Sequence, residues 1–324
     1  MTEKFVAEKE IFKTLDKILQ EHGLVLDLIM STSGTNHVVQ CHDENNKNFI
    51  IKILRKTSAE AKEAFLSEAK MNKFFSEQTT LPFTAPEQVF LYDQIDPIGL
   101  AYSLVEGEPA GWYYFYTGTK QVRTIGAETI ITALNYLQNN SQSLNDSIGF
   151  SVINQEQLSN KMKSYHTGAL AGGLSEEQYS ECHSITQDHV LDWLKNPVLV
   201  HGDFNPKNIL VTPEDGFGII DWSDAHLNCR YYDLAFMWLC FWRTPDVQDD
   251  IIKQIENSTD FFQLVCYWLP KFYSILHDVK TALIKEFDEG SIPLEAKVDN
   301  LEYIKQAQAF YVDKIDTFIA QAKK

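Results

Sequence analysis

The sequence predicts an α+β protein with two lobes, the first built on an antiparallel five-stranded sheet and the second mainly helical. Two observations predict this fold class: strand-like apolar runs crowd the first third of the chain, and helix-like apolar periodicity dominates after Gly107. The 324 residues are enough to bury a sizeable core in each lobe. Because the pattern changes near residue 106, we expect one domain over residues 1–106 and a second over residues 107–324.

The first lobe is expected to contain two helices besides its five strands. Apolar residues at near-helical spacing cover Phe5–His22, and Gly23 provides a stop. Thr57 or Ser58 can cap the second helix, which runs to about Phe75. The turn-rich segment HDENNKN should join the second and third strands as an antiparallel hairpin. The expected strands are Leu24–Met30, His37–Cys41, Asn48–Leu54, Gln88–Asp93 and Gly99–Val105.

Helices dominate the expected second lobe, and three short strands interrupt them. Val198–His201, Ile209–Val211 and Gly218–Ile220 are brief apolar runs flanked by turn residues, which sets this part of the chain apart. The expected helices are Thr129–Gln138, Gln155–Tyr165, Glu176–Leu194, Tyr232–Trp242 and Asp246–Ile255, followed by longer helical stretches from Phe261 to the end.

The composition disfavours nucleic-acid and membrane partners. The net charge of −17 argues against binding to phosphate backbones, which depends on clustered Lys and Arg, and an acidic surface attracts cations instead. The first residues show no apolar signal core, and no uncharged apolar run reaches the length of a membrane span. The five cysteines have no metal-like spacing, and Cys240 and Cys266 are expected to be buried free thiols. We therefore expect a cytoplasmic protein, and its oligomeric state stays open.

The most informative segment is Val198–Asp221, VLVHGDFNPKNILVTPEDGFGIID. An apolar strand leads into HGD, which ends in Asp203; Asn208 follows, and a later strand ends at Asp221. Phosphoryl transfer requires a carboxylate that positions the attacking hydroxyl and accepts its proton, together with metal ligands near the phosphates. Mg²⁺ prefers oxygen ligands and takes one or two carboxylates from the protein. We therefore predict Asp203 as the catalytic base and Asn208 and Asp221 as Mg²⁺ ligands.

This segment resembles the kinase-like phosphotransferases, a group that includes the aminoglycoside, choline and fructosamine kinases. The loop HGDFNPKN is similar to their HGD-x-x-x-x-N pattern, and Asp221-Trp222 stands where protein kinases have the first residues of DFG. The DLA segment at 233–235 resembles a further feature of the aminoglycoside branch, for which we expect a structural role. We expect His201 to be a buried hydrogen-bonding anchor for the loop. The resemblance implies a bilobal protein-kinase-like fold that binds ATP and Mg²⁺ between its lobes.

The resemblance also implies a lysine–glutamate pair in the first lobe. Lys52 lies in the strand FIIKIL, and a lone Lys in such a strand needs a partner. Glu68, on the helix that follows, stands where the family places this partner, so that Lys52 would hold the α- and β-phosphates and Glu68 would fix its direction. Glu63 is nearer in sequence and remains an alternative, and a solvated helix face is the other interpretation of Glu68.

Two further segments are candidates for binding the nucleotide. The loop STSGTN joins two strands, and its Ser33, Gly34 and Asn36 could present backbone N–H groups and polar side chains to the phosphates. Since it is not a glycine-rich phosphate motif, a plain hairpin turn is the alternative. The segment AYSLVEG resembles the family's hinge between lobes, where the backbone around Ser103 and Val105 would bind adenine.

The remaining polar and aromatic clusters are more typical of structure than of function. The aromatic run WYYFYTGTK, residues 112–120, is expected to be a buried cluster, with substrate stacking as the alternative. The acidic residues between Glu176 and Asp192 are expected to form a solvated helix face rather than a wall that binds cations.

Together these features predict an ATP-dependent phosphotransferase that acts on a hydroxyl of a small molecule, with an aminoglycoside-like or other cationic alcohol as the first candidate. A Ser/Thr protein kinase is disfavoured because Gly202 replaces Arg, Trp222 follows the metal-binding Asp, and no A-P-E stretch follows. A non-catalytic nucleotide-binding pseudokinase is disfavoured because it has no chemical need for all four of Asp203, Asn208, Asp221 and Lys52. The acceptor and the choice between ATP and GTP stay open.

Overall fold

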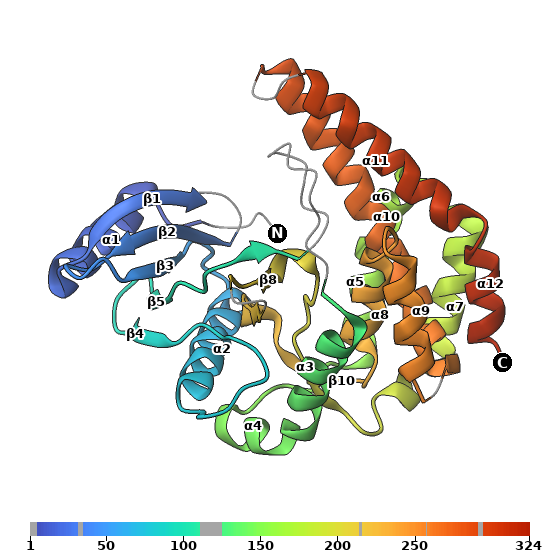
Figure 1. The fold of residues 1–324 in the computed structure, drawn as a ribbon, viewed down its shortest axis with the longest axis horizontal. Helices are drawn as coiled ribbons and strands as arrows, with labels where there is room; N and C mark the ends of the chain where they lie inside the picture. The colour runs from blue at the N-terminus through green and yellow to red at the C-terminus, as the bar shows by residue number, and fades with distance from the viewer. Residues whose placement is uncertain (1–4, 32–34, 111–124, 214–215, 257, 291–293) are drawn as a thin grey trace. The chain divides into compact units, whose positions relative to one another are not determined.

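The computed structural model describes residues 5–31, 35–110, 125–213, 216–256, 258–290 and 294–324 (Figure 1). The chain divides into two compact units. Unit 1 comprises Met1–Gly107, Ser143–Phe150 and Thr212–Ala225, and unit 2 comprises Glu108–Gln142, Ser151–Val211 and His226–Lys324. A domain boundary near residue 106 stays a prediction. Within the described residues, no helix is both long enough and apolar enough to cross a membrane.

Unit 1 contains a five-stranded antiparallel sheet, drawn in blue to cyan in Figure 1, which confirms the sheet predicted for the first lobe. Its strand order is β1-β2-β3-β5-β4, and β2 and β3 form the expected hairpin. Its strands are β1 (Val25–Ser31), β2 (Asn36–His42), β3 (Asn48–Leu54), β4 (Gln88–Tyr92) and β5 (Gly99–Ser103). Its other elements are α1 (Glu8–His22), α2 (Ala59–Ser76), most of α4 (Ser141–Ile148), β9 (Phe217–Ile219) and the 3-10 turn η2 (Trp222–Asp224).

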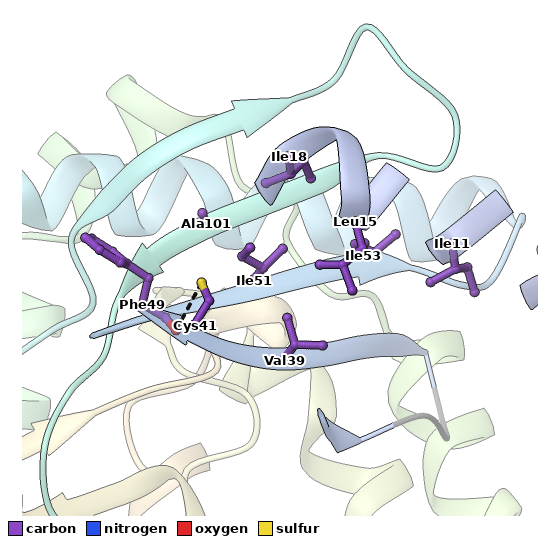
Figure 2. Close-up of a cluster of buried hydrophobic side chains, with 9 residues drawn as sticks. All are labelled: Ile11, Leu15, Ile18, Val39, Cys41, Phe49, Ile51, Ile53 and Ala101. Carbon is purple, nitrogen blue, oxygen red and sulfur yellow. Dashed lines mark hydrogen bonds between the residues drawn. The ribbon is translucent and has the colours of Figure 1, made fainter. Parts of the chain in front are cut away.

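Helix α1 covers one face of this sheet (Figure 2). Its buried residues Ile11, Leu15 and Ile18 recur at helical spacing and pack against alternate residues of the strands, among them Ile51 and Ile53 of β3. The helix ends as predicted, because Gly23 adopts the left-handed conformation at φ 62° and donates its N–H to the carbonyl of Leu19.

Helix α2 packs on the opposite face, where Phe65 and Ala69 contact Ile50 and Leu54. The side chain of Ser58 caps this helix by accepting a hydrogen bond from the N–H of Ala61 at 3.2 Å. Successive residues of a strand point to opposite faces, so Lys52 shares the α2 face with Ile50 and Leu54. The pleat of β3 therefore directs this lysine towards α2.

Unit 2 is mainly helical, as predicted, and α10 packs against most of its other helices. The buried side of α10 includes Leu264, Trp268 and Phe272. Its helices are α3 (Ala127–Asn139), α5 (Gln155–Ser164), α6 (His166–Ala171), α7 (Glu176–Trp193), α8 (Tyr232–Cys240), α9 (Pro245–Gln254), α10 (Ser258–Asp288), α11 (Leu294–Val312) and α12 (Ile315–Ala322). Its short elements are β6 (Glu108–Pro109), β7 (Val198–Val200), η1 (Pro206–Asn208), β8 (Ile209–Val211) and β10 (His226–Asn228).

The elements that the sequence did not predict are short or polar. Strand β10 pairs antiparallel with β7, and β6 pairs antiparallel with β8. Strand β10 has three residues and β6 has two, which is too short for an alternation of apolar and polar residues to be recognised in the sequence. Helix α4, SQSLNDSI, is rich in Ser, Asn and Asp, which compete with the helical backbone for hydrogen bonds and weaken the sequence signal.

Candidate active site

The loop His201–Asp203 follows strand β7 and is held by a buried carboxylate. Asp233, at the start of α8, accepts hydrogen bonds from the backbone N–H of His201 at 2.6 Å and from that of Gly202 at 3.0 Å. Gly202 has a φ of 84°, a conformation that residues with a side chain rarely adopt. The DLA segment therefore has the structural role expected of it, since its aspartate fixes the backbone that carries Asp203.

Hydrogen bonds from the rest of the loop orient Asp203 further. The buried ring of His201 accepts the N–H of Asp203 at 3.3 Å through Nδ1, so His201 is the anchor that its position predicted. The side-chain amides of Asn205 and Asn208 each donate to the backbone carbonyl of Asp203 at 2.9 Å. Asn205 also caps the turn η1 by accepting the N–H of Lys207 at 3.0 Å. Sequence reasoning missed Asn205, although an Asn two residues after the Asp is a typical turn signal.

Both oxygens of the Asp203 carboxylate accept hydrogen bonds or face cations. Asn208 Nδ2 donates to Oδ2 at 3.1 Å, and the ammonium of Lys207 lies 3.5 Å from the same oxygen. Lys271 Nζ donates to Oδ1 at 3.0 Å. Burial would raise the pKa of Asp203, but Lys271 and Lys207 outweigh burial and hold that pKa well below its usual value. Asp203 is therefore ionised and oriented, as a base that receives a hydroxyl must be.

Lys271 is the functional candidate that the sequence analysis missed. It lies on α10 and is the one charged residue in the apolar stretch FFQLVCYWLPKFYSIL, residues 261–276. The signal was available, because a lone charge among buried apolar residues needs a partner.

Unit 1 brings together three of the predicted residues, Lys52, Glu68 and Asp221. Lys52 Nζ donates to Glu68 Oε1 at 2.7 Å and to Asp221 Oδ1 at 2.9 Å. Glu68 is buried, whereas Glu63 is exposed on the same helix, so the structure selects Glu68 as the partner of Lys52. The selection follows from helix geometry, because Glu68 shares the buried side of α2 with Phe65 and Ala69.

The charges of this group are coupled. Burial alone would lower the pKa of Lys52, but Glu68, Tyr102 and Asp221 reverse that effect and hold it well above its usual value. Burial raises the pKa of Glu68, and Lys52 opposes that rise. Lys52 therefore carries its positive charge, and it binds the side chains of both Glu68 and Asp221, so the group consists of one ammonium and two carboxylates.

Asp221 differs from the other two residues in exposure and in backbone conformation. Its side chain is 39% exposed, and its Oδ1 also accepts a hydrogen bond from Ser223 Oγ at 3.2 Å. Its φ of 65° lies in the left-handed region, which is uncommon for a residue with a side chain and recurs at functional sites. Trp222, which follows it, is fully buried against Phe75 and Phe83 and anchors the turn η2.

The structure describes only part of the predicted nucleotide-binding loop and hinge. Ser33 and Gly34 lie outside the described residues, as do residues 112–120. Asn36 lines a cavity of about 330 Å³ in unit 1, together with Ser58 and Asp224, and its buried Oδ1 has no hydrogen-bond partner among the described residues. At the hinge, the N–H of Ser103 already donates to the carbonyl of Glu87 at 2.9 Å, and Val105 is buried.

The acidic residues of α7 lie at the surface. Three of them face bases: Glu176 pairs with His166, Asp192 with Lys195, and Glu181 with Lys323. Exposed carboxylates with such partners are typical of a solvated helix face, as the sequence predicts.

Comparison with known proteins assigns the chain to a family. The model of the phosphotransferase enzyme family matches residues 32–261. An aminoglycoside 3'-phosphotransferase of Escherichia coli is 31% identical over 84 residues, a match that spans 26% of this chain and 29% of that relative.

Solved structures share the fold at low sequence identity. A GDP complex of an aminoglycoside 2'-phosphotransferase has a TM-score of 0.58 at 14% identity, over 94% of this chain and 99% of that one. A macrolide 2'-phosphotransferase of Brachybacterium faecium has a TM-score of 0.53 at 14% identity, over 90% of this chain and 96% of that one. The fold predicted from the motif is confirmed, and the chain belongs to the phosphotransferase enzyme family.

Proposed function

We propose that this chain is an ATP-dependent kinase that transfers the γ-phosphate of ATP to a hydroxyl of a small molecule. The observation that carries the proposal is the Asp203 carboxylate, which is ionised, held by Asn208 and fixed on a rigid backbone. Such a group has the geometry of a base for an incoming hydroxyl. The Asp203 side chain is 20% exposed, so it can still receive a further hydrogen bond from outside the loop.

In the proposed reaction, Asp203 accepts a hydrogen bond from the acceptor hydroxyl. The acceptor oxygen attacks the γ-phosphorus, the bond from that phosphorus to the β–γ bridging oxygen breaks, and ADP leaves with the bond's electrons. The hydroxyl proton passes to the Asp203 carboxylate and from there to solvent. Because this transition state needs little covalent help, positioning and charge account for most of the catalysis.

We assign nucleotide binding to the residues of unit 1. Lys52 would contact the α- and β-phosphates, with its direction fixed by Glu68. Ser33, Gly34 and Asn36 would face the phosphates. In support of this, Asn36 lines the adjacent cavity, and its Oδ1 has no hydrogen-bond partner among the described residues. The backbone of Ser103 and Val105 would bind adenine, and since the Ser103 N–H is engaged in the sheet, Val105 is the better donor.

Each of the two proposed ligands has an oxygen donor whose chemistry suits Mg²⁺. Asp221 offers a half-exposed carboxylate and Asn208 an amide oxygen, which are the hard ligands that Mg²⁺ takes in small number beside phosphate oxygens. Among the described residues, no three His, Cys, Asp or Glu side chains form a metal-binding group, so phosphate oxygens and water would complete the coordination. When bound, Mg²⁺ would neutralise charge on the phosphate oxygens.

The proposed acceptor is an aminoglycoside-like or other cationic alcohol. The net charge of −17 favours a cation, and one structure of similar fold is a complex with GDP and kanamycin, at a TM-score of 0.52. We place the enzyme in the cytoplasm, without nucleic-acid or membrane partners.

A screen of acceptors tests this function. Purified protein is incubated with Mg²⁺ and either ATP or GTP, together with kanamycin, gentamicin, a macrolide or choline, and phosphorylated products are detected by mass spectrometry. We expect phosphorylation of at least one alcohol, its loss when Mg²⁺ is chelated, and its loss in Asp203→Asn. Nucleotide binding with no transfer to any alcohol would instead support a nucleotide-binding protein without kinase activity.

A further inference from the structure

Lys271 contacts the Asp203 carboxylate from a different element, helix α10, which lies far from the catalytic loop in sequence. We propose that Lys271 is a positioning residue that fixes the orientation of the Asp203 carboxylate for the acceptor hydroxyl. The proposal rests on the proposed phosphotransfer, in which Asp203 receives that hydroxyl. Lys271 Nζ donates to Asp203 Oδ1 at 3.0 Å, and the lysine side chain is only 13% exposed.

Two aromatic rings hold the ammonium of Lys271 in place. Its Nζ lies 4.3 Å from the ring centroid of Phe236 on α8 and 4.8 Å from that of Trp268 on α10. Trp268 is itself fixed, because its Nε1 donates to the carbonyl of Tyr232 at 2.7 Å and its ring is buried. A cation over two buried rings is attracted to their faces and loses little freedom when it also binds a carboxylate. The lysine is thus ordered before any substrate binds.

The contacts of Asp203 divide between its two oxygens. Lys271 binds Oδ1, while Asn208 binds Oδ2, so the carboxylate is held at both ends and cannot rotate about its terminal bond without breaking one contact. Lys207 also faces Oδ2, but at 3.5 Å and with a side chain that is 44% exposed, which makes it a weaker constraint. Oδ1 accepts a hydrogen bond from Lys271 through one of its two lone pairs, so its second lone pair can receive a hydroxyl while the orientation is maintained.

Burial gives a further reason to assign Lys271 a role in the reaction. An ammonium in an apolar helix costs desolvation energy, and a well-packed apolar side chain of similar size would often serve stability as well or better. If Lys271 positions Asp203, its loss should instead lower the catalytic rate, because small displacements of a reacting group can lower a rate by as much as ~10²-fold. Measurements of kcat therefore distinguish a positioning role of Lys271 from a purely structural one.

The test compares three variants of the full-length protein with the acceptor found in the screen. In Lys271→Met we expect kcat to fall about 10- to 100-fold while KM for Mg-ATP stays within about 2-fold, because the contact acts on the reacting carboxylate and not on nucleotide binding. Lys271→Arg keeps a donor for Oδ1 and should recover most of the rate. Lys161→Met is the matched control, since Lys161 lies 5.7 Å from the same Trp268 ring and donates to the Tyr232 hydroxyl at 3.3 Å. Its kcat should stay near that of the wild type.

A double variant shows whether Lys271 acts through Asp203. If it does, Lys271→Met should cost nothing further in an Asp203→Asn background. An equal loss in both backgrounds, or a wild-type kcat in Lys271→Met, would overturn the proposal.

Crystal structures of Lys271→Met and Lys271→Arg give a measurement that needs no acceptor. We expect the Asp203 carboxylate to rotate or to occupy two orientations in Lys271→Met and to keep one orientation in Lys271→Arg. An unchanged carboxylate in Lys271→Met contradicts positioning whatever the kinetics show. If no acceptor is ever phosphorylated, the proposed function fails on its own, and the crystal structures still decide the role of Lys271.

Discussion

The two groups of lysines and carboxylates in this molecule have opposite charge balances. In unit 1, the Lys52 group joins one ammonium to two carboxylates, Glu68 and Asp221. In unit 2, the Asp203 group joins one carboxylate to two ammonium groups, Lys271 and Lys207. The first group keeps an uncompensated negative charge at the half-exposed Asp221, which suits a bound cation. The second already has its carboxylate compensated, which suits the orientation of a neutral hydroxyl.

The largest expected effect comes from removing the carboxylate of the Asp203 group. Asp203→Asn should lower kcat by at least ~10²-fold, because the amide cannot accept the hydroxyl proton. The affinity for Mg-ATP should change little, since the residues assigned to the nucleotide belong mostly to unit 1, whereas Asp203 belongs to unit 2. Steady-state kinetics with the identified acceptor measure the first effect and calorimetry measures the second.

Asp188→Asn is the matched control for this variant, because the same chemical change falls on an exposed residue of α7 in the same unit. Near wild-type turnover in Asp203→Asn would remove Asp203 from the mechanism. A strong loss of nucleotide affinity in this variant would mean that the division of roles between the two groups is wrong.

The second expected effect separates the two proposed Mg²⁺ ligands. Asp221→Ala should abolish Mg²⁺-dependent nucleotide binding, because it removes the full negative charge that Lys52 and Glu68 leave uncompensated. Asn208→Ala should weaken binding less, and higher Mg²⁺ should partly restore it, since an amide offers only a dipole. Calorimetry of Mg-ATP binding ranks the variants, and the opposite order would contradict the charge argument.

The sequence predicted some parts of these two groups and not others, for physical reasons. The loop around Asp203 was found because its residues are local, and a fixed spacing encodes a fixed geometry. The family resemblance favoured Glu68 over Glu63, but the residues themselves could separate the two only through knowledge of which side of α2 is buried. Lys271 comes from a helix distant in sequence, so the loop pattern contains no information about it.

The fold was predicted more completely than the site. The strand Asn48–Leu54 is as expected to the residue, because continuous burial gives it a strong apolar signal. The left-handed backbone of Asp221 was not expected, since no local pattern calls for it in a residue with a side chain. Strain of that kind is maintained by surrounding structure, here by the buried Trp222, and is therefore visible only after folding.

A third prediction concerns the buried side of the Lys52 group. Glu68→Gln should lower the free energy of unfolding by about 2 kcal/mol, because a neutral amide replaces the buried carboxylate that binds the Lys52 ammonium. Glu63→Gln, the same change on the exposed side of α2, should stay within about 0.5 kcal/mol of the wild type. Chemical denaturation of both variants makes the comparison. Equal stabilities would show that the pair with Lys52 contributes nothing to folding.

The smallest expected effect is a difference in salt dependence between the KM for the acceptor and the KM for Mg-ATP. If the acceptor is a cation, long-range attraction by the acidic protein lowers its KM, and this attraction must be screened by ions. The Debye length falls from about 30 Å at 0.01 M salt to about 8 Å at physiological ionic strength, so the acceptor KM should rise several-fold over that range. The KM for Mg-ATP should change less, since direct contacts at Lys52 and Asp221 are screened weakly. Three acidic residues of α7, Glu176, Glu181 and Asp192, already pair with bases, which makes that helix a poor source of the attraction. Neutralising Glu177 and Asp188 of the same helix should therefore leave the salt dependence of the acceptor KM intact. Titrations of the acceptor at the two salt concentrations decide the matter. An acceptor KM that does not respond to salt, or a best acceptor that is neutral or anionic, would leave solubility as the role of the net charge of −17.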